Sequence, residues 1–152
     1  KFDGSPGLSG NANYTTSNNG TLSALSTRGD ILWSQENSSH NSPIVIDDRV
    51  FVTSAEGFVR AFSAKTGLLL WENKILKGRR LAAPQNLAGF IVTADDEGYV
   101  HIFDTQSGGL LDRFRVDSEG IRSPMTSDGT YLYALGNDGV LASIAVYLFK
   151  KR

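Results

Sequence analysis

Asp95, Asp96 and Glu97 form the densest acidic cluster in the sequence and are its best candidates for binding a hard cation such as Ca²⁺. Such a site needs about six to eight converging oxygen ligands, so we interpret these residues as a solvated hairpin turn. The two histidines, His40 and His101, have no metal-ligand spacing, which argues against a zinc site. His101 is predicted to be a packed or surface residue of a strand. No nucleophile, phosphate-binding or dinucleotide motif occurs. The sequence therefore predicts no catalytic, metal-binding or cofactor-binding residues.

Two short segments could contact a partner. The segment KGRR, residues 77–80, is basic, but four residues make a weak electrostatic footprint, so we interpret it as a solvated loop. The three leucines at 68–70 could form an exposed stripe on an edge strand that accepts an added strand. Burial of at least alternate positions is nevertheless expected, because side chains alternate between the two faces of a strand.

Length, charge and cysteine content narrow the class of protein. The chain has 152 residues, enough for one domain with a core, and a net charge of −1. That charge gives no field that would attract nucleic acid, so nucleic-acid binding is not expected. With no cysteine, disulfides and thiolate metal sites are excluded and the compartment is left open. The chain begins at Lys1, and we expect it to be a mature or excised piece of a longer protein.

The chain repeats itself. A tight x-Gly turn recurs at intervals of 37, 41 and 41 residues, at Gly20, Gly57, Gly98 and Gly139. A leading proline recurs in step with the turn, at Pro6, Pro43, Pro84 and Pro124. Self-similarity of this period indicates a solenoid, a propeller or an array. We divide the single domain into four units, approximately 1–36, 37–76, 77–117 and 118–152.

Each unit reads as four short antiparallel strands. In the second unit these are SPIVID, RVFVTSA, FVRAFSA and LLLWEN, at 42–47, 49–55, 58–64 and 68–73. The strands are rich in β-branched and aromatic residues, and glycine turns separate them. No window has helical periodicity. This pattern is typical of a propeller blade, so the sequence predicts an all-β fold of about four blades, with 146–152 as the last strand.

Five residues recur as structural landmarks. Gly29, Gly67 and Gly108 are predicted to close the turn between the third and fourth strands, and Trp33 and Trp71 follow in the fourth strand. A large ring there can cover the seam with the next blade and bury roughly 150–250 Å². We favour this packing role over stacking on a cofactor. The third unit has Asp112 where the other two have tryptophan.

Residues 61–71, AFSAKTGLLLW, match the repeat A-x-D-x-x-T-G-x-x-x-W except that Ser63 replaces the aspartate. This resembles the eight-bladed propellers first known from pyrroloquinoline-quinone dehydrogenases. The runs at 14–33 and 94–144, above all DSEG…P…DG…NDG over 117–139, are similar to the BamB family, lipoproteins of the bacterial outer-membrane β-barrel assembly machinery. The resemblance implies that the chain is half of an eight-bladed ring.

The same resemblance implies a function. The chain would be a non-enzymatic scaffold at the periplasmic face of the outer membrane, held there by an N-terminal lipid anchor that this chain lacks. Its partners would be the periplasmic domains of the central barrel-assembly subunit and unfolded outer-membrane proteins. In the family, acidic residues just before a leading proline contact the partner. Asp3 occupies one such position, and Lys1 stands at the other.

Alternatives stay open at this point. The chain could be a fragment of a pyrroloquinoline-quinone-dependent dehydrogenase, although the vicinal cysteines typical of that site are absent. It could also be a structural propeller of another complex. Half a ring would expose two apolar flanks. A homodimer of half-propellers or a missing other half is favoured over a closed four-bladed ring.

Overall fold

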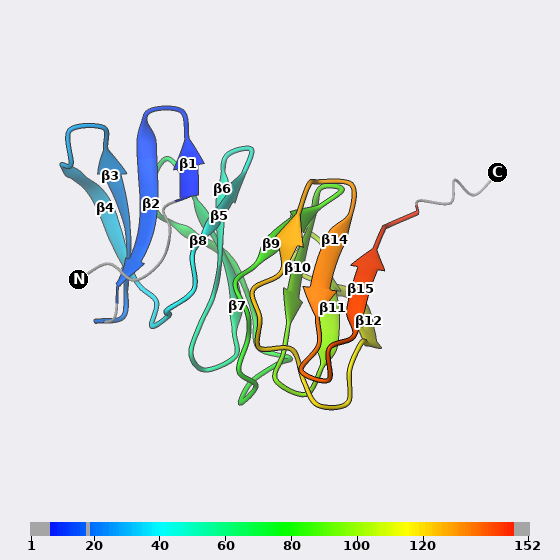
Figure 1. Cartoon of the computed structure of the whole chain (residues 1–152). Coiled ribbons are helices and arrows are strands. Elements are labelled where there is room, and N and C mark those ends of the chain that lie inside the picture. The colour runs from blue at the N-terminus through cyan, green and yellow to red at the C-terminus, as the bar shows by residue number, and fades with distance from the viewer. Residues whose placement is uncertain (1–6, 18, 148–152) are drawn as a thin grey trace.

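The computed structural model describes residues 7–17 and 19–147. Four antiparallel sheets follow one another along the chain, and within each sheet the strands pair in sequence order (Figure 1). The first blade contains β1 (Gly7–Ser9), β2 (Ala12–Ser17), β3 (Thr21–Ser26) and β4 (Ile31–Glu36). The second contains β5 (Ile44–Ile46), β6 (Arg49–Thr53), β7 (Val59–Ser63) and β8 (Leu69–Asn73).

The third blade contains β9 (Gln85–Leu87), β10 (Phe90–Ala94), β11 (Tyr99–Phe103) and β12 (Leu110–Arg115). The fourth contains three strands among the described residues, β13 (Thr126–Ser127), β14 (Leu132–Leu135) and β15 (Leu141–Ile144). The predicted last strand is not seen at Val146 and Tyr147, and its residues 148–152 lie outside the described part of the chain.

The sheets are arranged around an axis. The first strands of consecutive blades are neighbours, because β1 contacts β5, β5 contacts β9 and β9 contacts β13. The later strands of each blade fan outward, so that β4, β8 and β12 form the outer edges. This arrangement confirms the predicted all-β fold built of propeller blades.

The third and fourth strands meet at an irregularity in each complete blade. The register of their pairing shifts between Ala24 and Leu25, and between Ala61 and Phe62 in the next blade. The third blade has the same shift between Ile102 and Phe103. A β-bulge bends the strand and increases its twist, so the outer edge of each blade turns away from its inner strands.

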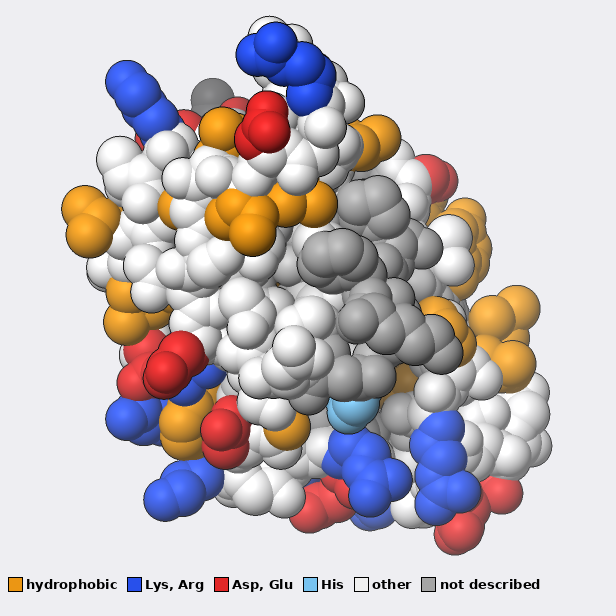
Figure 2. Space-filling view, turned by 90° about the vertical axis from the view of Figure 1, so that its left-hand side faces the viewer, with side chains coloured by type: hydrophobic (Ala, Val, Ile, Leu, Met, Phe, Trp, Pro, Cys, Tyr) orange, Lys and Arg blue, Asp and Glu red, His pale blue; other side chains and the backbone are white. Residues whose placement is uncertain are grey.

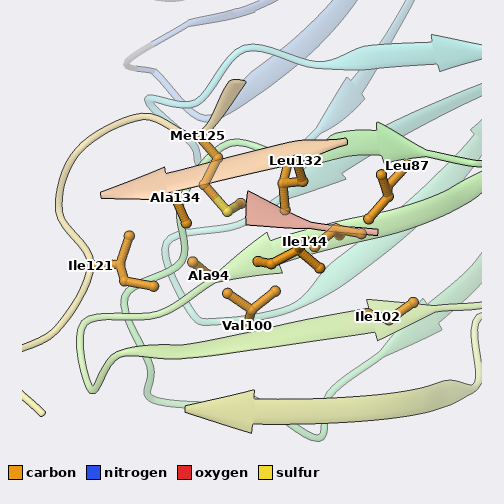
Figure 3. Close-up of a cluster of buried hydrophobic side chains, with 10 residues drawn as sticks. Leu87, Ala94, Val100, Ile102, Ile121, Met125, Leu132, Ala134 and Ile144 are labelled. Atoms are coloured by element: carbon orange, nitrogen blue, oxygen red, sulfur yellow. The ribbon is translucent and has the colours of Figure 1, made fainter. Parts of the chain in front are cut away.

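The core lies between the blades. Separate clusters of buried side chains fill the interfaces between the first and second, second and third, and third and fourth blades. Figure 3 shows the last of these, in which Val100 and Ile102 of β11 lie near Ile144 of β15. Each fully buried aliphatic side chain contributes about 1.5–3 kcal/mol. Most of the stability therefore comes from contacts between blades.

The fourth blade has an apolar face that no described residue covers. Val92, at the centre of the core between blades, is fully buried, whereas Tyr133, which lies 41 residues later at the same repeat position, is 40% exposed. Leu135 and Leu141 on the same face are 42% and 68% exposed. The four blades therefore form an open arc rather than a closed four-bladed ring. The homodimer of half-propellers stays a prediction.

Two tryptophans lie across the seams between blades. The Trp33 indole donates a hydrogen bond to the carbonyl of Ala64 in the second blade, at 2.9 Å. Its ring lies against Gly67, where an added Cβ would come within 2.7 Å of it. Trp71 repeats this arrangement one blade later. Its indole donates to the carbonyl of Thr105 at 3.0 Å and lies against Gly108.

These glycines therefore have two reasons to lack a side chain. Gly67 has a φ of +74°, a conformation that strains other residues, and its open face is occupied by the Trp33 ring. Gly29 has a φ of +89° with nothing within 4 Å of an added Cβ, so it serves the turn alone.

We predict that Gly67→Ala destabilises the protein more than Gly89→Ala. Both glycines have positive φ, +74° and +83°, and an alanine there costs roughly 1–2 kcal/mol. Only the Cβ at position 67 would also collide with a ring, which adds roughly 1–3 kcal/mol. Urea unfolding measures the difference. Equal decreases in the free energy of unfolding would show that the contact between the Trp33 ring and Gly67 does not constrain the fold.

Candidate functional site

One end of the propeller axis is hollowed into a cavity of about 600 Å³, which we call the axial cavity. Its wall comes from two kinds of segment, the chain just before each leading proline and the tight turns between second and third strands. The lining residues are Ser39, His40, Asn41, Ser54, Ala55, Arg80, Leu81, Ala82, Asp96, Ile121 and Arg122. Three blades therefore contribute to one concave surface.

The repeat links this cavity to the predicted partner-binding residue. Asp3 lies three residues before its leading proline, and the same position in the later units is occupied by His40, Leu81 and Ile121. All three of the later residues line the axial cavity. Asp3 itself lies outside the described residues, so its role stays a prediction.

The wall of the cavity is held by hydrogen bonds between segments of neighbouring units. The amide of Asn41 donates to the Thr53 hydroxyl and to the Leu81 carbonyl, both at 2.8 Å. The hydroxyls of Thr53 and Thr93 both donate to the Ala82 carbonyl, at 3.1 and 2.9 Å. These contacts tie the second and third blades together next to the opening, so the surface is pre-formed.

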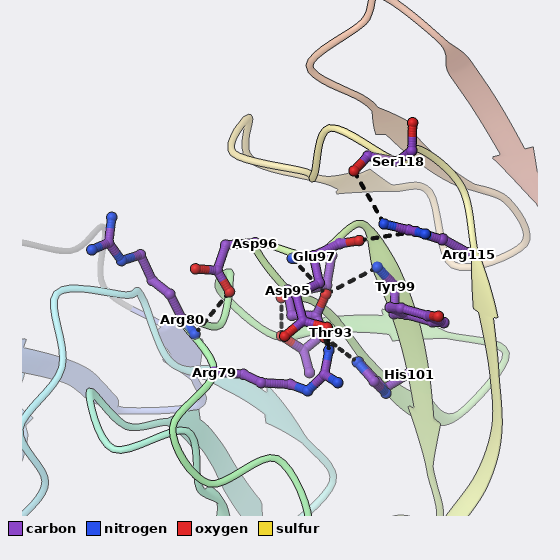
Figure 4. A network of polar contacts seen from close by, with 11 residues as sticks. Arg79, Arg80, Thr93, Asp95, Asp96, Glu97, Tyr99, His101, Arg115 and Ser118 are labelled. Atoms are coloured by element: carbon purple, nitrogen blue, oxygen red, sulfur yellow. Dashed lines mark hydrogen bonds and ion pairs between the residues drawn. The ribbon is translucent and has the colours of Figure 1, made fainter.

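The acidic cluster beside the cavity is only partly a solvated turn. Asp96 and Glu97 are exposed, as expected, but Asp95 is fully buried, and the expectation was wrong for it. Its Oδ2 accepts from Arg79 at 2.5 Å and from the His101 Nε2 at 2.8 Å (Figure 4). Its Oδ1 accepts from the backbone N–H groups of Glu97 and Tyr99, at 3.1 and 2.9 Å.

The basic loop at 77–80 is also only partly exposed to solvent. Lys77 and Arg80 are exposed, whereas Arg79 is half-buried and pairs with Asp95 and, at 2.9 Å, with Glu97. Its guanidinium also lies 5.5 Å from the centre of the Tyr99 ring, in cation–π range. The expectation of a solvated loop was therefore wrong for Arg79, which connects the segment between β8 and β9 to the turn after β10.

His101 completes this buried network. The ring is fully buried on β11, and within the described residues its Nδ1 has no hydrogen-bond partner. Because a carboxylate can only accept, the Nε2 of His101 carries a proton and donates it to Asp95. Burial alone would raise the pKa of Asp95, but hydrogen bonds from His101, Tyr99 and Arg79 outweigh it and lower the pKa to about 2.

In the fourth blade, a different residue provides the carboxylate that accepts from the backbone of the tight turn. Gly136 stands at the repeat position of Asp95, and the Asp117 carboxylate occupies the space beside it. That carboxylate is buried and accepts from the backbone N–H groups of Glu119 and Asp138, at 2.8 and 3.0 Å. Asp117 therefore joins the loop before β13 to the turn after β14.

The outer strands carry exposed aliphatic side chains. Leu68, Leu69 and Leu70 are all exposed, so the expected burial of alternate positions was wrong. The register shift beside β8 breaks the alternation, and no strand beyond β8 covers it. Similar side chains are exposed on β4, at Ile31 and Leu32, and on β12, at Leu111. Figure 2 shows several hydrophobic side chains standing out around the rim of one face.

No candidate for catalysis emerges from the described residues. Within 7–17 and 19–147, no three His, Cys, Asp or Glu side chains are placed to hold a metal ion. The same residues contain no helix long and apolar enough to span a bilayer. The polar groups that do gather, around Asp95, are engaged with one another.

Comparison with known proteins decides the family. The family model described as outer membrane protein assembly factor BamB matches residues 1–86. The chain belongs to the BamB family. The BamB of Pseudomonas aeruginosa is 34% identical over 146 residues, which are 95% of this chain but 38% of that protein. The chain thus spans less than two fifths of the length of this curated BamB relative.

Solved structures agree with the BamB assignment. The crystal structure of BamB from Moraxella catarrhalis has a TM-score of 0.88 and 32% identity, and the match covers 95% of this chain and 43% of that one. The quinohemoprotein alcohol dehydrogenase of Comamonas testosteroni has a TM-score of 0.78 at 15% identity, covering 95% of this chain and 33% of that enzyme. This second likeness shows the fold alone, so the dehydrogenase reading has less support.

We predict that Asp95→Asn lowers the free energy of unfolding near pH 6 by about 3 kcal/mol or more, because Arg79 and His101 lose a buried charged acceptor. The wild type should approach the variant in acid. Folding lowers the pKa of Asp95 from 3.8 to about 2. The ionised carboxylate therefore stabilises the folded state above pH ~4, and about 2 kcal/mol of the free energy of unfolding is lost as the pH falls through 2.

Denaturant unfolding of both proteins between pH 6 and 2 measures this difference. Asp96→Asn is the matched control, because that carboxylate is exposed and, within residues 7–17 and 19–147, accepts a hydrogen bond only from the backbone N–H of Arg80. A gap between wild type and Asp95→Asn that stays constant with pH would contradict the role of the Asp95 charge.

Proposed function

We propose that this chain is part of a non-enzymatic scaffold that assists the assembly of β-barrel proteins at the periplasmic face of the bacterial outer membrane. Its principal partner would be the periplasmic domains of the central barrel-assembly subunit. Membership of the BamB family carries this proposal. In the full-length protein an N-terminal lipid would anchor the scaffold to the membrane.

The physical character of the described residues supports a binding role. The core is divided among seams between blades, so the loops at the ends of the blades are free to carry recognition. The wall of the axial cavity is fixed by hydrogen bonds between units. A pre-formed surface loses less conformational entropy on association than a flexible one. The end of the propeller that carries the axial cavity is therefore the proposed docking face.

We predict that Asp3→Lys weakens capture of the central subunit's periplasmic domains by about tenfold or more, because the reversal places two like charges together. Quantitative pull-down or biolayer interferometry with those domains measures it. Asp48→Lys is the control, since that side chain is 90% exposed in the turn between β5 and β6. Equal weakening by both variants would indicate a general charge effect and contradict the role of Asp3.

Unfolded outer-membrane proteins are the second proposed partner. Such clients are long amphipathic segments destined to become β-strands. The outer strands β4, β8 and β12 each lack a neighbour on one side within their own sheet. Their unpaired backbone groups can accept an added strand, and exposed leucines beside them offer apolar contact. A client strand could thus extend a blade without unfolding it.

We predict that Leu69→Lys combined with Leu70→Lys reduces the ability of the chain to delay aggregation of an unfolded outer-membrane protein, because charge on an edge strand opposes strand addition. Light scattering of a urea-diluted client measures the delay, and a loss of several-fold is expected. Ile75→Lys is the control, since Ile75 is also exposed but lies in the loop after β8 and not on a strand. An unchanged delay would argue against binding at β8.

A further inference from the structure

We propose that the axial cavity binds an acidic peptide segment of a protein partner, with Arg80 and Arg122 as the residues that contact its carboxylates. This inference deepens the proposed scaffold function and rests on it only for the identity of the partner. It specifies that the partner's segment is acidic and that its binding site on this chain is the axial cavity.

The first observation is that these two guanidinium groups are unused by the fold. Four other arginines donate side-chain hydrogen bonds within the protein: Arg49, Arg60, Arg79 and Arg115. Among the described residues, the guanidinium groups of Arg80 and Arg122 have no such contact, and both side chains are exposed. They come from different blades and line the same cavity.

The carboxylate in the wall does not neutralise this pair. Asp96 lines the cavity too, but its Oδ1 accepts from the backbone N–H of Arg80, at 3.2 Å. Figure 4 shows the Arg80 side chain extending away from Asp96 and from the network around Asp95. Asp96 therefore holds the backbone of Arg80 in place, and among the described residues the lining has two guanidinium groups against one carboxylate. The imidazole of His40 adds a further polar group to the same wall.

The cavity suits a peptide better than a lone small anion. Its volume of about 600 Å³ is in the range of sites for drug-sized ligands. Ser39 and Asn41 provide polar surface, while Leu81 and Ile121 provide apolar surface, and a polypeptide has groups that match both. Arginine binds carboxylates in bidentate fashion, and two arginines from separate blades can grip successive acidic side chains. The net charge of −1 means that attraction would be local to the cavity.

A direct binding assay tests this proposal. A fluorescein-labelled hexaglutamate peptide serves as the probe, and its anisotropy is measured with the full 152-residue chain. Combining Arg80→Gln with Arg122→Gln should weaken binding by at least about tenfold, since contacts to charged groups are the strong ones. Arg28→Gln with Lys65→Gln is the matched control, because it removes the same charge from exposed side chains outside the cavity.

Each outcome decides the matter. Loss of binding in the cavity variant but not in the control supports the proposal, and so does failure of a hexaglutamine peptide to bind. The proposal is overturned if the cavity variant binds as tightly as wild type, or if the control loses as much. Displacement of the probe by an equal concentration of inorganic phosphate would assign the cavity to small anions instead.

Two further arms keep the result interpretable. Arg80→Lys with Arg122→Lys keeps the charge and removes the bidentate geometry, so an intermediate affinity is expected, and wild-type affinity would refute the bidentate contact. Thermal unfolding should be unchanged in all variants, because the Arg80 and Arg122 side chains hold no contact with the part of the chain that the structure describes. The assay contains no assembly subunit. A failed pull-down with intact peptide binding would thus refute the proposed partner and leave the cavity chemistry standing.

Discussion

The structure depends on one constraint: a four-stranded blade has two apolar faces, and each face contributes to stability only where another apolar surface covers it. Along β10, Ile91 packs toward the second blade and Val92 toward the fourth, and both are fully buried. The third blade is therefore stabilised by its neighbours on both faces, so the repeat is a property of the interfaces between blades. The tryptophan seam adds precision, because the ring of one blade fits over the glycine turn of the next.

This division of labour explains why the tight turns can differ. The turn after β6 is closed by the Ser54 hydroxyl, which accepts from the Phe58 N–H at 3.2 Å. Asp95 makes the equivalent contact in the third blade, and Asp117 stands in for it in the fourth. The backbone donors of a turn must be satisfied, yet the acceptor can come from any segment that reaches. The sequence of the turns is thus free to change wherever the seams are preserved.

The same logic separates what the sequence could predict from what it could not. Strands, glycine turns and the period of the repeat are local signals, and residues 42–73 revealed a whole blade. The pairing of Asp95 with Arg79 could not be predicted from local signals, because the two residues are 16 apart in the chain. They meet only when the segment between β8 and β9 packs on the turn after β10. The exposure of residues 68–70 was missed since the bulge beside β8 breaks the alternation on which the expectation rested. The axial cavity needs three blades in place before it exists.

The buried network also explains why Asp95 is a poor candidate for a general base or a metal ligand. A general base must be able to gain a proton near neutral pH, and a ligand for a metal must have an oxygen to spare. Asp95 has neither property, because both of its oxygens accept hydrogen bonds from the protein and its pKa is lowered to about 2. Its charge is committed to holding Arg79 and His101 in place. Arg80 and Arg122 have no such commitment among the described residues, and both lie exposed in the lining of the axial cavity, where they can meet another molecule.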